Sequence, residues 1–221
     1  MKKLSLIFSF LVGAFILTAW VYKPNIAFNN NFEGVKIGNQ LWMKENLNVD
    51  KFQNGDAIPE VKTKEEWEKA WKNKLPAFCY FDNDTTNGNK YGKLYNWHAV
   101  NDPRGLSPKG WHIPIDSEWE KLIDFLGGEN TAGNKMKSTS GWAENGNGTN
   151  ESGFIGLPGG YRTFEGDFFD LGNYGYWYSN TETPKEYDID SAWGRSMNVE
   201  ENVSREGSSK GYGYSVRCIK D

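Results

Sequence analysis

The sequence predicts an α+β fold, because segments with helical spacing come early in the chain and strand-like segments come late. Apolar residues recur at helical intervals within 63–72 and again within 117–126. From Phe154 onward the chain changes to short aromatic runs separated by turn residues. We therefore expect early helices packed on short, mainly antiparallel strands, with long irregular loops.

The first 19 residues have the pattern of a secretory signal peptide. Lys2 and Lys3 precede an apolar run from Leu4 to Ala19, and Ala19 is small enough for cleavage after it. The apolar stretch continues to Tyr22, so the alternative is that residues 4–22 stay as an uncleaved anchor of about the 20 residues that a membrane helix needs. Both alternatives predict an extracytoplasmic protein: secreted, periplasmic or at the cell surface.

Residues 20–33 are rich in asparagine and have no apolar periodicity, which predicts a linker to one domain at 34–221. Without residues 1–19 the chain has 23 basic and 29 acidic residues, because two of its 25 basic residues are lost, and its net charge is −6. This acidic balance disfavours nucleic acid and anionic lipid as partners. Membrane contact is expected only through residues 4–22, if they are not cleaved.

The domain begins with a strand-like segment from Val35 to Leu47, followed by a helix from Thr63 to Lys72. Thr63 and Glu66 have the spacing of a capping box, which satisfies unpaired amide groups at a helix start. The apolar stripe of this helix includes Trp71.

A short buried strand at Phe78–Phe81 leads into the polar segment Asp82–Asn89. Its oxygen-bearing side chains are similar to those of a calcium loop. The glycine comes one residue late, however, and Lys93 stands where a bidentate glutamate is needed. An Asx-rich turn is the better interpretation.

The later elements follow the same reasoning. A helix is expected from Leu94, a strand between Pro108 and Pro114, and a helix that Ser117 and Glu120 would cap. Residues 138–152 are a polar loop. The later strands are expected at Phe154–Leu157, Gly160–Phe164, Tyr176–Ser179, Ala192–Met197 and Tyr214–Ile219.

Cys79 and Cys218 are the only cysteines in the chain. Neither follows the signal segment, so the chain is not expected to be a lipoprotein, and neither lies in a zinc or dithiol motif. A disulfide between them would close nearly the whole fold and stabilise it by about 5 kcal/mol in the chain-entropy model. Two separately buried thiols are the alternative.

Segments along the whole domain resemble the Fibrobacter succinogenes major paralogous domain, a family of exported bacterial modules. The matching segments are Gly38–Met43, Glu45–Leu47, Cys79–Asp84, Tyr91–Trp97, Pro108–Pro114 with Glu118 and Trp119, Gly153–Phe154, Gly159–Arg162, Trp177–Ser179 and Ser215–Cys218. They cover essentially residues 34–221. Members of this family often carry a cysteine where this chain has Ser107, a departure that puts the pairing of Cys79 with Cys218 in doubt.

The order of these segments is also similar to the wider C-type-lectin-like fold, including its formylglycine-generating branch. That resemblance implies a two-layer α+β domain whose N- and C-terminal strands pair and whose irregular loops present the ligand site. The copper chemistry of that branch needs two nearby cysteines, and Cys218 has no second cysteine close to it in the sequence.

The sequence contains no catalytic constellation that we can identify. The motifs G-x-S-x-G and H-E-x-x-H do not occur. The two histidines, His98 and His112, are expected to be hydrogen-bonded structural residues. Asp167 and Asp170 stand beside aromatic residues, so a carbohydrate-active enzyme that uses them remains an alternative.

The aromatic and polar residues of segment 161–195 are more typical of a binding surface. Sugar rings stack on aromatic side chains and hydrogen-bond to carboxylate, amide and guanidinium groups. The candidate ligand-binding residues are Tyr161, Arg162, Asp167, Phe168, Asp170, Asn173, Tyr174, Tyr176 and Arg195. Trp177 is left out, because Trp-Tyr-Ser at a strand start is typical of a core.

No cofactor is predicted. Calcium-assisted binding stays open, but the tripeptides Glu-Pro-Asn and Gln-Pro-Asp of calcium-dependent lectins do not occur. We therefore expect an exported, non-catalytic ligand-binding or adhesion module whose ligand is an extracellular glycan or protein. The alternatives are the enzyme above and a purely structural surface module.

Overall fold

The computed structural model describes residues 32–187 and 190–221. The predicted signal peptide and residues 20–31 of the predicted linker lie outside the described residues. The compact unit begins at Phe32, which packs against the core, and the carboxylate of Glu33 pairs with Lys44 at 3.0 Å. The domain therefore starts two residues before the predicted boundary. Within the described ranges, no helix is both long and apolar enough to span a membrane.

The chain forms mixed helices and strands, as predicted. The helices are α1 (Lys64–Lys72), η1 (Phe81–Asn83, a 3-10 turn), α2 (Thr85–Tyr91), α3 (Trp97–Val100), α4 (Asp116–Phe125) and α5 (Glu129–Met136). The strands are β1 (Gly34–Ile37), β2 (Gln40–Met43), β3 (Phe78–Cys79), β4 (Leu94–Tyr95), β5 (Trp111–His112), β6 (Gly159–Arg162), β7 (Phe168–Leu171), β8 (Gly175–Glu182), β9 (Ser191–Met197), β10 (Val203–Ser209) and β11 (Ile219–Lys220). The α+β prediction is confirmed.

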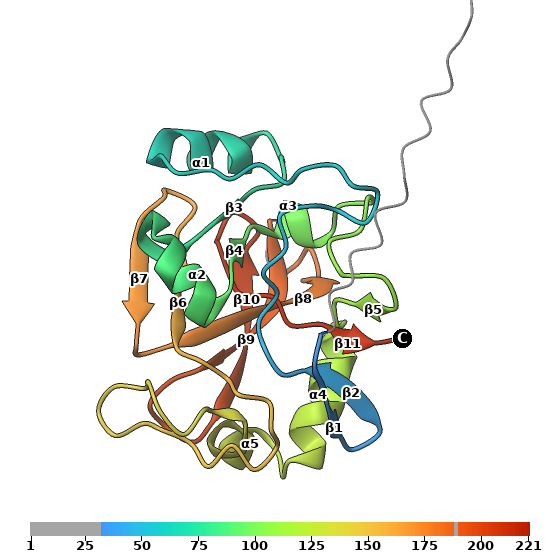
Figure 1. The fold of residues 1–221 in the computed structure, drawn as a ribbon, viewed down its shortest axis with the longest axis vertical. Helices are drawn as coiled ribbons and strands as arrows, with labels where there is room; N and C mark the ends of the chain where they lie inside the picture. The colour runs from blue at the N-terminus through green and yellow to red at the C-terminus, as the bar shows by residue number, and fades with distance from the viewer. Residues whose placement is uncertain (1–31, 188–189) are drawn as a thin grey trace, which may run out of the picture. The chain divides into compact units, whose positions relative to one another are not determined.

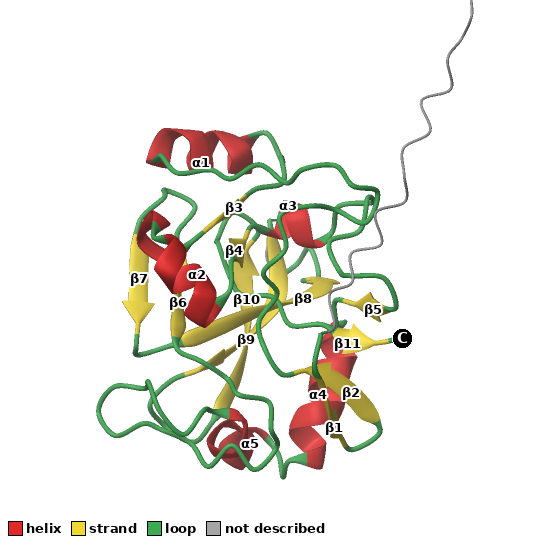
Figure 2. Ribbon diagram, in the orientation of Figure 1, coloured by secondary structure: helices red, strands yellow, loops and turns green. Residues whose placement is uncertain are grey.

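The strands form three sheets that are mainly antiparallel. One has the order β1-β2-β11-β5, a larger one has the order β10-β9-β8-β6-β7, and β3 pairs with β4. The exception is β6, which meets β8 in parallel at Gly160 and Gly175. Figure 1 shows β6, β7 and α2 on one side of the domain, with β5, β11 and β2 on the other. Figure 2 shows how much of the chain between these elements is loop.

Aromatic side chains fill the core. Trp42 packs on Trp119 with ring centroids 4.8 Å apart, and Phe154 contacts both of them at 5.9 Å. Trp177 joins the same cluster and is 1% exposed, which confirms that it belongs to the core. A buried aromatic ring removes more apolar surface from water than any aliphatic residue, so these few side chains carry much of the packing energy.

The two long predicted helices form, but only one begins as predicted. Thr63 caps α1, and Glu66 completes the capping box. The predicted cap of Ser117 with Glu120 on α4 is wrong. The N-cap is Ile115, two residues before Ser117, and Glu118 accepts a hydrogen bond from the backbone amide of Ile115 at 2.9 Å.

Several boundaries differ from the sequence prediction. The segment predicted as an Asx-rich turn contains η1 and α2, and the Asp84 carboxylate caps α2 through the amide of Thr86. Leu94 and Tyr95 form β4, so the predicted helix is confined to α3, which the Asn96 side chain caps. Each difference follows from an Asx side chain that bonds to nearby backbone amides and so sets where a helix begins.

The later half also differs in places. Phe154–Leu157 is not a strand, because Ile155 has a positive φ of 54° that breaks the extended backbone. Of the strand predicted at Tyr214–Ile219, only Ile219 lies in a strand, β11, while Tyr214 and Ser215 form isolated bridges to Tyr95 and Trp177. Helix α5 and strand β10 were not predicted.

Cys79 and Cys218 are free thiols, so the disulfide alternative is not realised. They lie in different core clusters, Cys79 near α1 and Cys218 beside β2. Burial raises the pKa of Cys79 to about 12 and also raises that of Cys218. Both side chains therefore behave as small apolar core residues.

Candidate functional site

The ribbon of β6 and β7 separates the candidate residues into two groups. Tyr161 pairs with Phe169 and Arg162 pairs with Phe168 across the ribbon. Successive side chains of a strand point to opposite faces, whereas directly paired residues share one face. Tyr161 and Phe169 therefore lie on one face of the ribbon, and Arg162 and Phe168 lie on the other.

The first face carries a row of aromatic rings that we call the aromatic strip. The ring centroids of Tyr161 and Tyr176 are 5.0 Å apart. Tyr176 in turn stacks on Tyr174, with a centroid distance of 5.6 Å and an interplanar angle of 11°. In the other direction Tyr161 lies 5.4 Å from Tyr212. Tyr212 is parallel to Phe164 at 5.9 Å. The strip is thus continuous over rings that come from different segments.

Trp71 ends the strip, with its ring centroid 4.5 Å from Phe164. All members of the strip are partly exposed: Trp71, Phe164, Tyr212, Tyr161, Tyr176 and Tyr174. Beneath them Tyr214 is 3% exposed and stacks on Tyr176 at 4.9 Å. A buried ring layer therefore supports the row and limits how far its members can turn.

Two carboxylates lie beside the middle of the strip. Asp170 accepts a hydrogen bond of 2.9 Å from the Tyr176 hydroxyl. Burial, followed by the interaction with Asp170 and the charge of Glu206, raises the pKa of Tyr176. Burial and the same two carboxylates raise the pKa of Tyr161. Both phenols therefore stay protonated; the Tyr176 hydroxyl donates its proton to Asp170 and keeps only its acceptor capacity for another group.

Glu206 comes from β10, on the same face of the larger sheet as Tyr176. Its Oε1 atom is covered and has no hydrogen-bond partner within the described part of the chain. Asn173 is exposed in the turn between Asp170 and Tyr174, where its backbone amide donates to the backbone carbonyl of Asp170 at 3.0 Å. The strip thus combines part-exposed rings with the Asp170 carboxylate beside them, while the unpaired Glu206 oxygen is covered.

The second face of the ribbon borders an open hollow of about 320 Å³, which we call the polar hollow. Its lining residues come from three segments of the chain: Lys62, Lys64, Asp82, Asn83, Arg162, Gly166, Asp167 and Phe168. Lys64 forms an ion pair with Asp167, and Lys62 pairs with Glu60 at 3.1 Å. Three of the nine predicted residues therefore line this hollow rather than the strip.

Arg162 is a structural residue of this region. It is 0% exposed, and its guanidinium donates to the carbonyls of Val61, Lys62 and Thr63 at 2.7–3.0 Å and of Gly166 at 3.1 Å. The group also lies over the ring of Trp67, 4.6 Å from its centroid. Its donors are committed to the backbone, so Arg162 shapes the hollow and is not available as a ligand contact.

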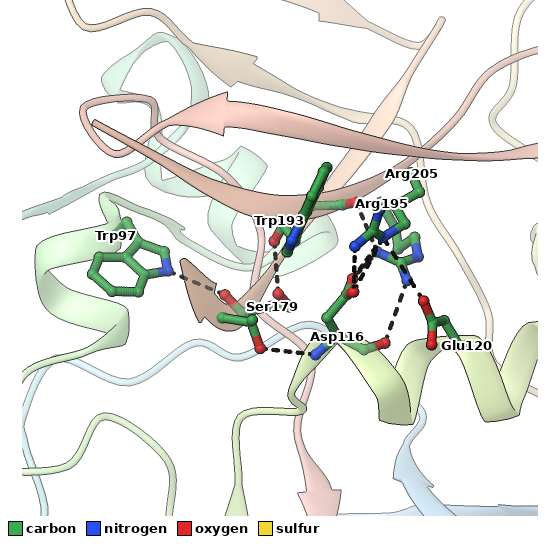
Figure 3. Close-up of polar contacts among 9 residues, drawn as sticks. Trp97, Asp116, Glu120, Ser179, Trp193, Arg195 and Arg205 are labelled. Carbon is green, nitrogen blue, oxygen red and sulfur yellow. Dashed lines mark hydrogen bonds and ion pairs between the residues drawn. The ribbon is translucent and has the colours of Figure 1, made fainter. Parts of the chain in front are cut away.

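Arg195 belongs to neither group, contrary to the sequence prediction. It faces α4, where its guanidinium donates to the Asp116 carboxylate at 2.7 Å, and Arg205 donates to the same carboxylate at 2.7 Å (Figure 3). The reason is strand alternation: Arg195 pairs with Trp177, while its neighbour Ser196 pairs with Tyr176. Arg195 therefore points to the face opposite the strip.

The network around Asp116 is structural as well. Arg205 lies 3.5 Å from the centroid of the Trp193 ring and 3.9 Å from Glu120. Burial alone would raise the pKa of Asp116, but the hydrogen bonds and charges of Arg205 and Arg195 lower it. Asp116 is therefore held as a carboxylate that joins α4 to β9 and β10.

His112 is hydrogen-bonded as we expected, whereas Nε2 of His98 is buried and has no hydrogen-bond partner within the described part of the chain. His112 bonds through Nδ1 to Asp221 at 2.8 Å and through Nε2 to Glu118 at 3.1 Å. His98 is partly buried, and burial lowers its pKa. Searched over the described ranges, the domain shows no group of three or more His, Cys, Asp or Glu residues that could hold a metal ion.

Part of the strip lies outside segment 161–195, to which the predicted binding residues were confined. Trp71 was assigned to the buried stripe of its helix, yet it is half-buried and its indole donates to Asp190 at 2.8 Å. Tyr212 and Tyr214 lie in a Gly-Tyr-Gly-Tyr run. Aromatic residues at alternate positions with small neighbours were the available signal for a ring layer.

Comparison with known proteins identifies a matching family model but no individual similar protein. The family model of the Fibrobacter succinogenes major domain matches residues 35–220. Searches of curated proteins and of solved structures find no significant match. The matched range covers nearly all of the described domain, so this chain belongs to the Fibrobacter succinogenes major domain family.

Proposed function

We propose that this protein is an extracytoplasmic, non-catalytic module that binds a carbohydrate along its aromatic strip. The observation that carries the proposal is the continuous row of part-exposed rings from Trp71 to Tyr174. Tyrosine and tryptophan combine a large apolar face with one polar tip, which suits the apolar faces and hydroxyl rims of sugar rings.

The polar groups of the strip fit the same ligand. The Tyr161 and Tyr176 hydroxyls are protonated, and the Asp170 carboxylate offers acceptor oxygens beside them. Sugar hydroxyls both donate and accept hydrogen bonds, so they can use each of these groups. Flat rings in a row contact a linear chain better than a compact ligand, which favours a polysaccharide.

The location and the finer fold belong to the same proposal. The pattern of residues 1–19 supports export. A C-type-lectin-like fold is supported by the pairing of β2, near the start of the domain, with β11 at its end, and by the long loops. These loops supply several of the strip residues.

Replacing Tyr174 by alanine tests the proposal, because this ring ends the strip and stacks on one neighbour only. The purified protein would be run in gels that contain soluble polysaccharides and titrated with oligosaccharides of cellulose, xylan, mannan and chitin. We expect retardation by at least one polymer and an affinity at least about tenfold lower for Tyr174→Ala, since a tenfold change needs only about 1.4 kcal/mol.

Tyr187→Ala is the matched control, because Tyr187 is 59% exposed and contacts Trp193 away from the strip. It should bind as the unmodified protein does. An equal loss of polysaccharide affinity in both variants, or no retardation by any polymer, would overturn the proposal. Release of sugars from a polymer, abolished by Asp170→Asn, would favour the enzyme alternative instead.

A further inference from the structure

The polar hollow lies on the face of the β6–β7 ribbon opposite the strip and has the dimensions of a small-ligand site. Its volume of about 320 Å³ is at the lower end of the range of about 300–1,000 Å³ that is usual for small-molecule pockets. It has room for one small ligand and not for a polymer segment of several units. Neither the family nor the proposed function assigns a role to it.

The walls of the hollow are fixed before any ligand arrives. Arg162 joins the segment Val61–Thr63 to Gly166 through its carbonyl hydrogen bonds. The side-chain amide of Asn83 donates to the Lys62 carbonyl at 3.0 Å and so ties η1 to the same segment. A pocket that is already formed loses little conformational entropy on binding.

The charges around the hollow are balanced, which points to a neutral ligand. Lys64 is paired with Asp167, and Lys62 is paired with Glu60. Arg162 and Asp82 add one charge of each sign to the same lining. An ionic ligand would have to compete with one of these pairs, whereas a polyhydroxylated ligand can donate to the carboxylates and accept from the ammonium groups.

The Asp82–Asn83 wall leaves hydrogen-bonding capacity unused. The Asp82 carboxylate is exposed and forms no side-chain hydrogen bond or ion pair with residues of 32–187 and 190–221. Asn83 Oδ1 is covered and has no partner in the same ranges. Both residues have a positive φ, 52° and 55°, a conformation that Asp and Asn adopt more readily than most other residues.

We propose that the polar hollow binds a single neutral sugar ring, as a free monosaccharide. Its hydroxyls donate to Asp82 and Asp167 and accept from Lys64, while one edge of the ring rests on Phe168. A hydroxyl beside Asn83 reaches Oδ1 after a small rotation of the amide. The site is independent of the aromatic strip, so it goes beyond the proposed function.

The test is a titration of the full chain, labelled with 15N, with glucose, galactose, mannose, xylose, arabinose and N-acetylglucosamine. We expect one or more of these sugars to bind with a dissociation constant of about 1 mM, because a ligand this small can gain only a few contacts. The amide signals of Asp82, Gly166 and Asp167 should shift. Those of Tyr174 and Tyr176 should not.

Asp82→Asn is the informative variant, because asparagine tolerates the positive φ and removes only the charge. It should weaken monosaccharide binding at least about tenfold, as expected for a lost charged acceptor. Asp124→Asn on the exposed side of α4 is the matched control and should bind normally. Lys64→Met gives a second route to the same loss if Asp82→Asn does not fold.

The proposal is wrong if no sugar shifts the signals of the hollow, or if folded Asp82→Asn and Lys64→Met proteins bind as the unmodified chain does. Its failure is distinguishable from failure of the strip. Tyr174→Ala should lower polymer retardation and leave monosaccharide binding unchanged, and Asp82→Asn should do the reverse.

Discussion

Tyr161 and Arg162 are neighbours in one strand, yet they lie in regions with opposite properties. Tyr161 is part of the half-exposed aromatic strip, and burial and the charges of Asp170 and Glu206 raise its pKa. Arg162 is 0% exposed and holds four backbone carbonyls. Both residue types suit ligand binding, so residue type alone did not separate them. The difference teaches that a polar residue can bind a ligand only if the fold leaves its donors free.

The largest expected effect comes from Arg162→Met. The variant keeps much of the apolar contact with Trp67 but leaves four carbonyls without donors, each of which costs about 1–3 kcal/mol when buried. We expect a loss of unfolding free energy of at least about 4 kcal/mol, below additivity because some carbonyls will find water. Urea denaturation followed by tryptophan fluorescence measures it.

Arg104→Met is the control for that experiment. Arg104 is a surface residue paired with Asp102 and Asp56, and its side chain is 35% exposed. Such pairs contribute up to about 1 kcal/mol. If both variants lose stability equally, the buried arginine has no special structural role and the comparison fails.

The next largest effect is expected for Asp116→Asn. This variant tests whether Arg195, like Arg162, is a structural residue rather than a ligand-binding one. The change leaves the buried Arg195 charge without its carboxylate, and breaking such a pair costs about 3 kcal/mol or more. Polysaccharide retardation should not change once the variant is folded. A loss of retardation in folded protein would return Arg195 to the binding surface.

The same residue predicts a dependence on pH. The pKa of Asp116 in the folded state is below its value of about 3.9 in the unfolded state, so this carboxylate stabilises the protein above about pH 4. The stabilisation is lost as the pH falls through the folded-state pKa. The melting temperature should therefore fall less steeply as the pH drops below about 4 in Asp116→Asn than in the unmodified protein.

The smallest effect is expected for Tyr176→Phe in the strip. The ring and its stacking stay, and only the hydrogen bond to Asp170 is removed. Unfolding free energy should fall by about 1 kcal/mol, the usual net contribution of one hydrogen bond. Polysaccharide affinity should fall less than in Tyr174→Ala. A stability loss as large as that of Arg162→Met would mean that the strip is core.

The sequence predicted the fold class and the elements with strong periodicity. The capping box at Thr63, the helix containing Trp119, and strands β8 and β9 all followed from local patterns. Local signals suffice for such elements because caps and periodic apolar faces are properties of the segment itself.

Elements that depend on distant partners could not be predicted. β10 reads Val-Ser-Arg-Glu-Gly-Ser-Ser and has no alternating apolar pattern, yet it pairs with β9 along its whole length. α5 contains poor helix formers, and its Gly133 has no room for a side chain because the Asn202 carbonyl lies against it. In both cases tertiary contacts override weak local preference.

The candidate site was predicted in part for the same reason. Tyr161, Asp170, Tyr174 and Tyr176 do meet, because they lie on the neighbouring strands β6, β7 and β8 and in the turn between β7 and β8. Their neighbours Trp71, Tyr212 and Glu206 come from segments far away in the sequence. Only the folded sheet brings these residues into one row.

The pairing of the last strand has a consequence for the order of events during folding. β11 lies between β2 and β5 in its sheet, and Ile219 contacts both Trp42 and His112 through strand pairing. The pairing of the earliest strands of the domain into this sheet thus depends on residues near its end. This sheet therefore cannot close before β11 has formed, so the two ends of the domain become ordered together rather than in chain order.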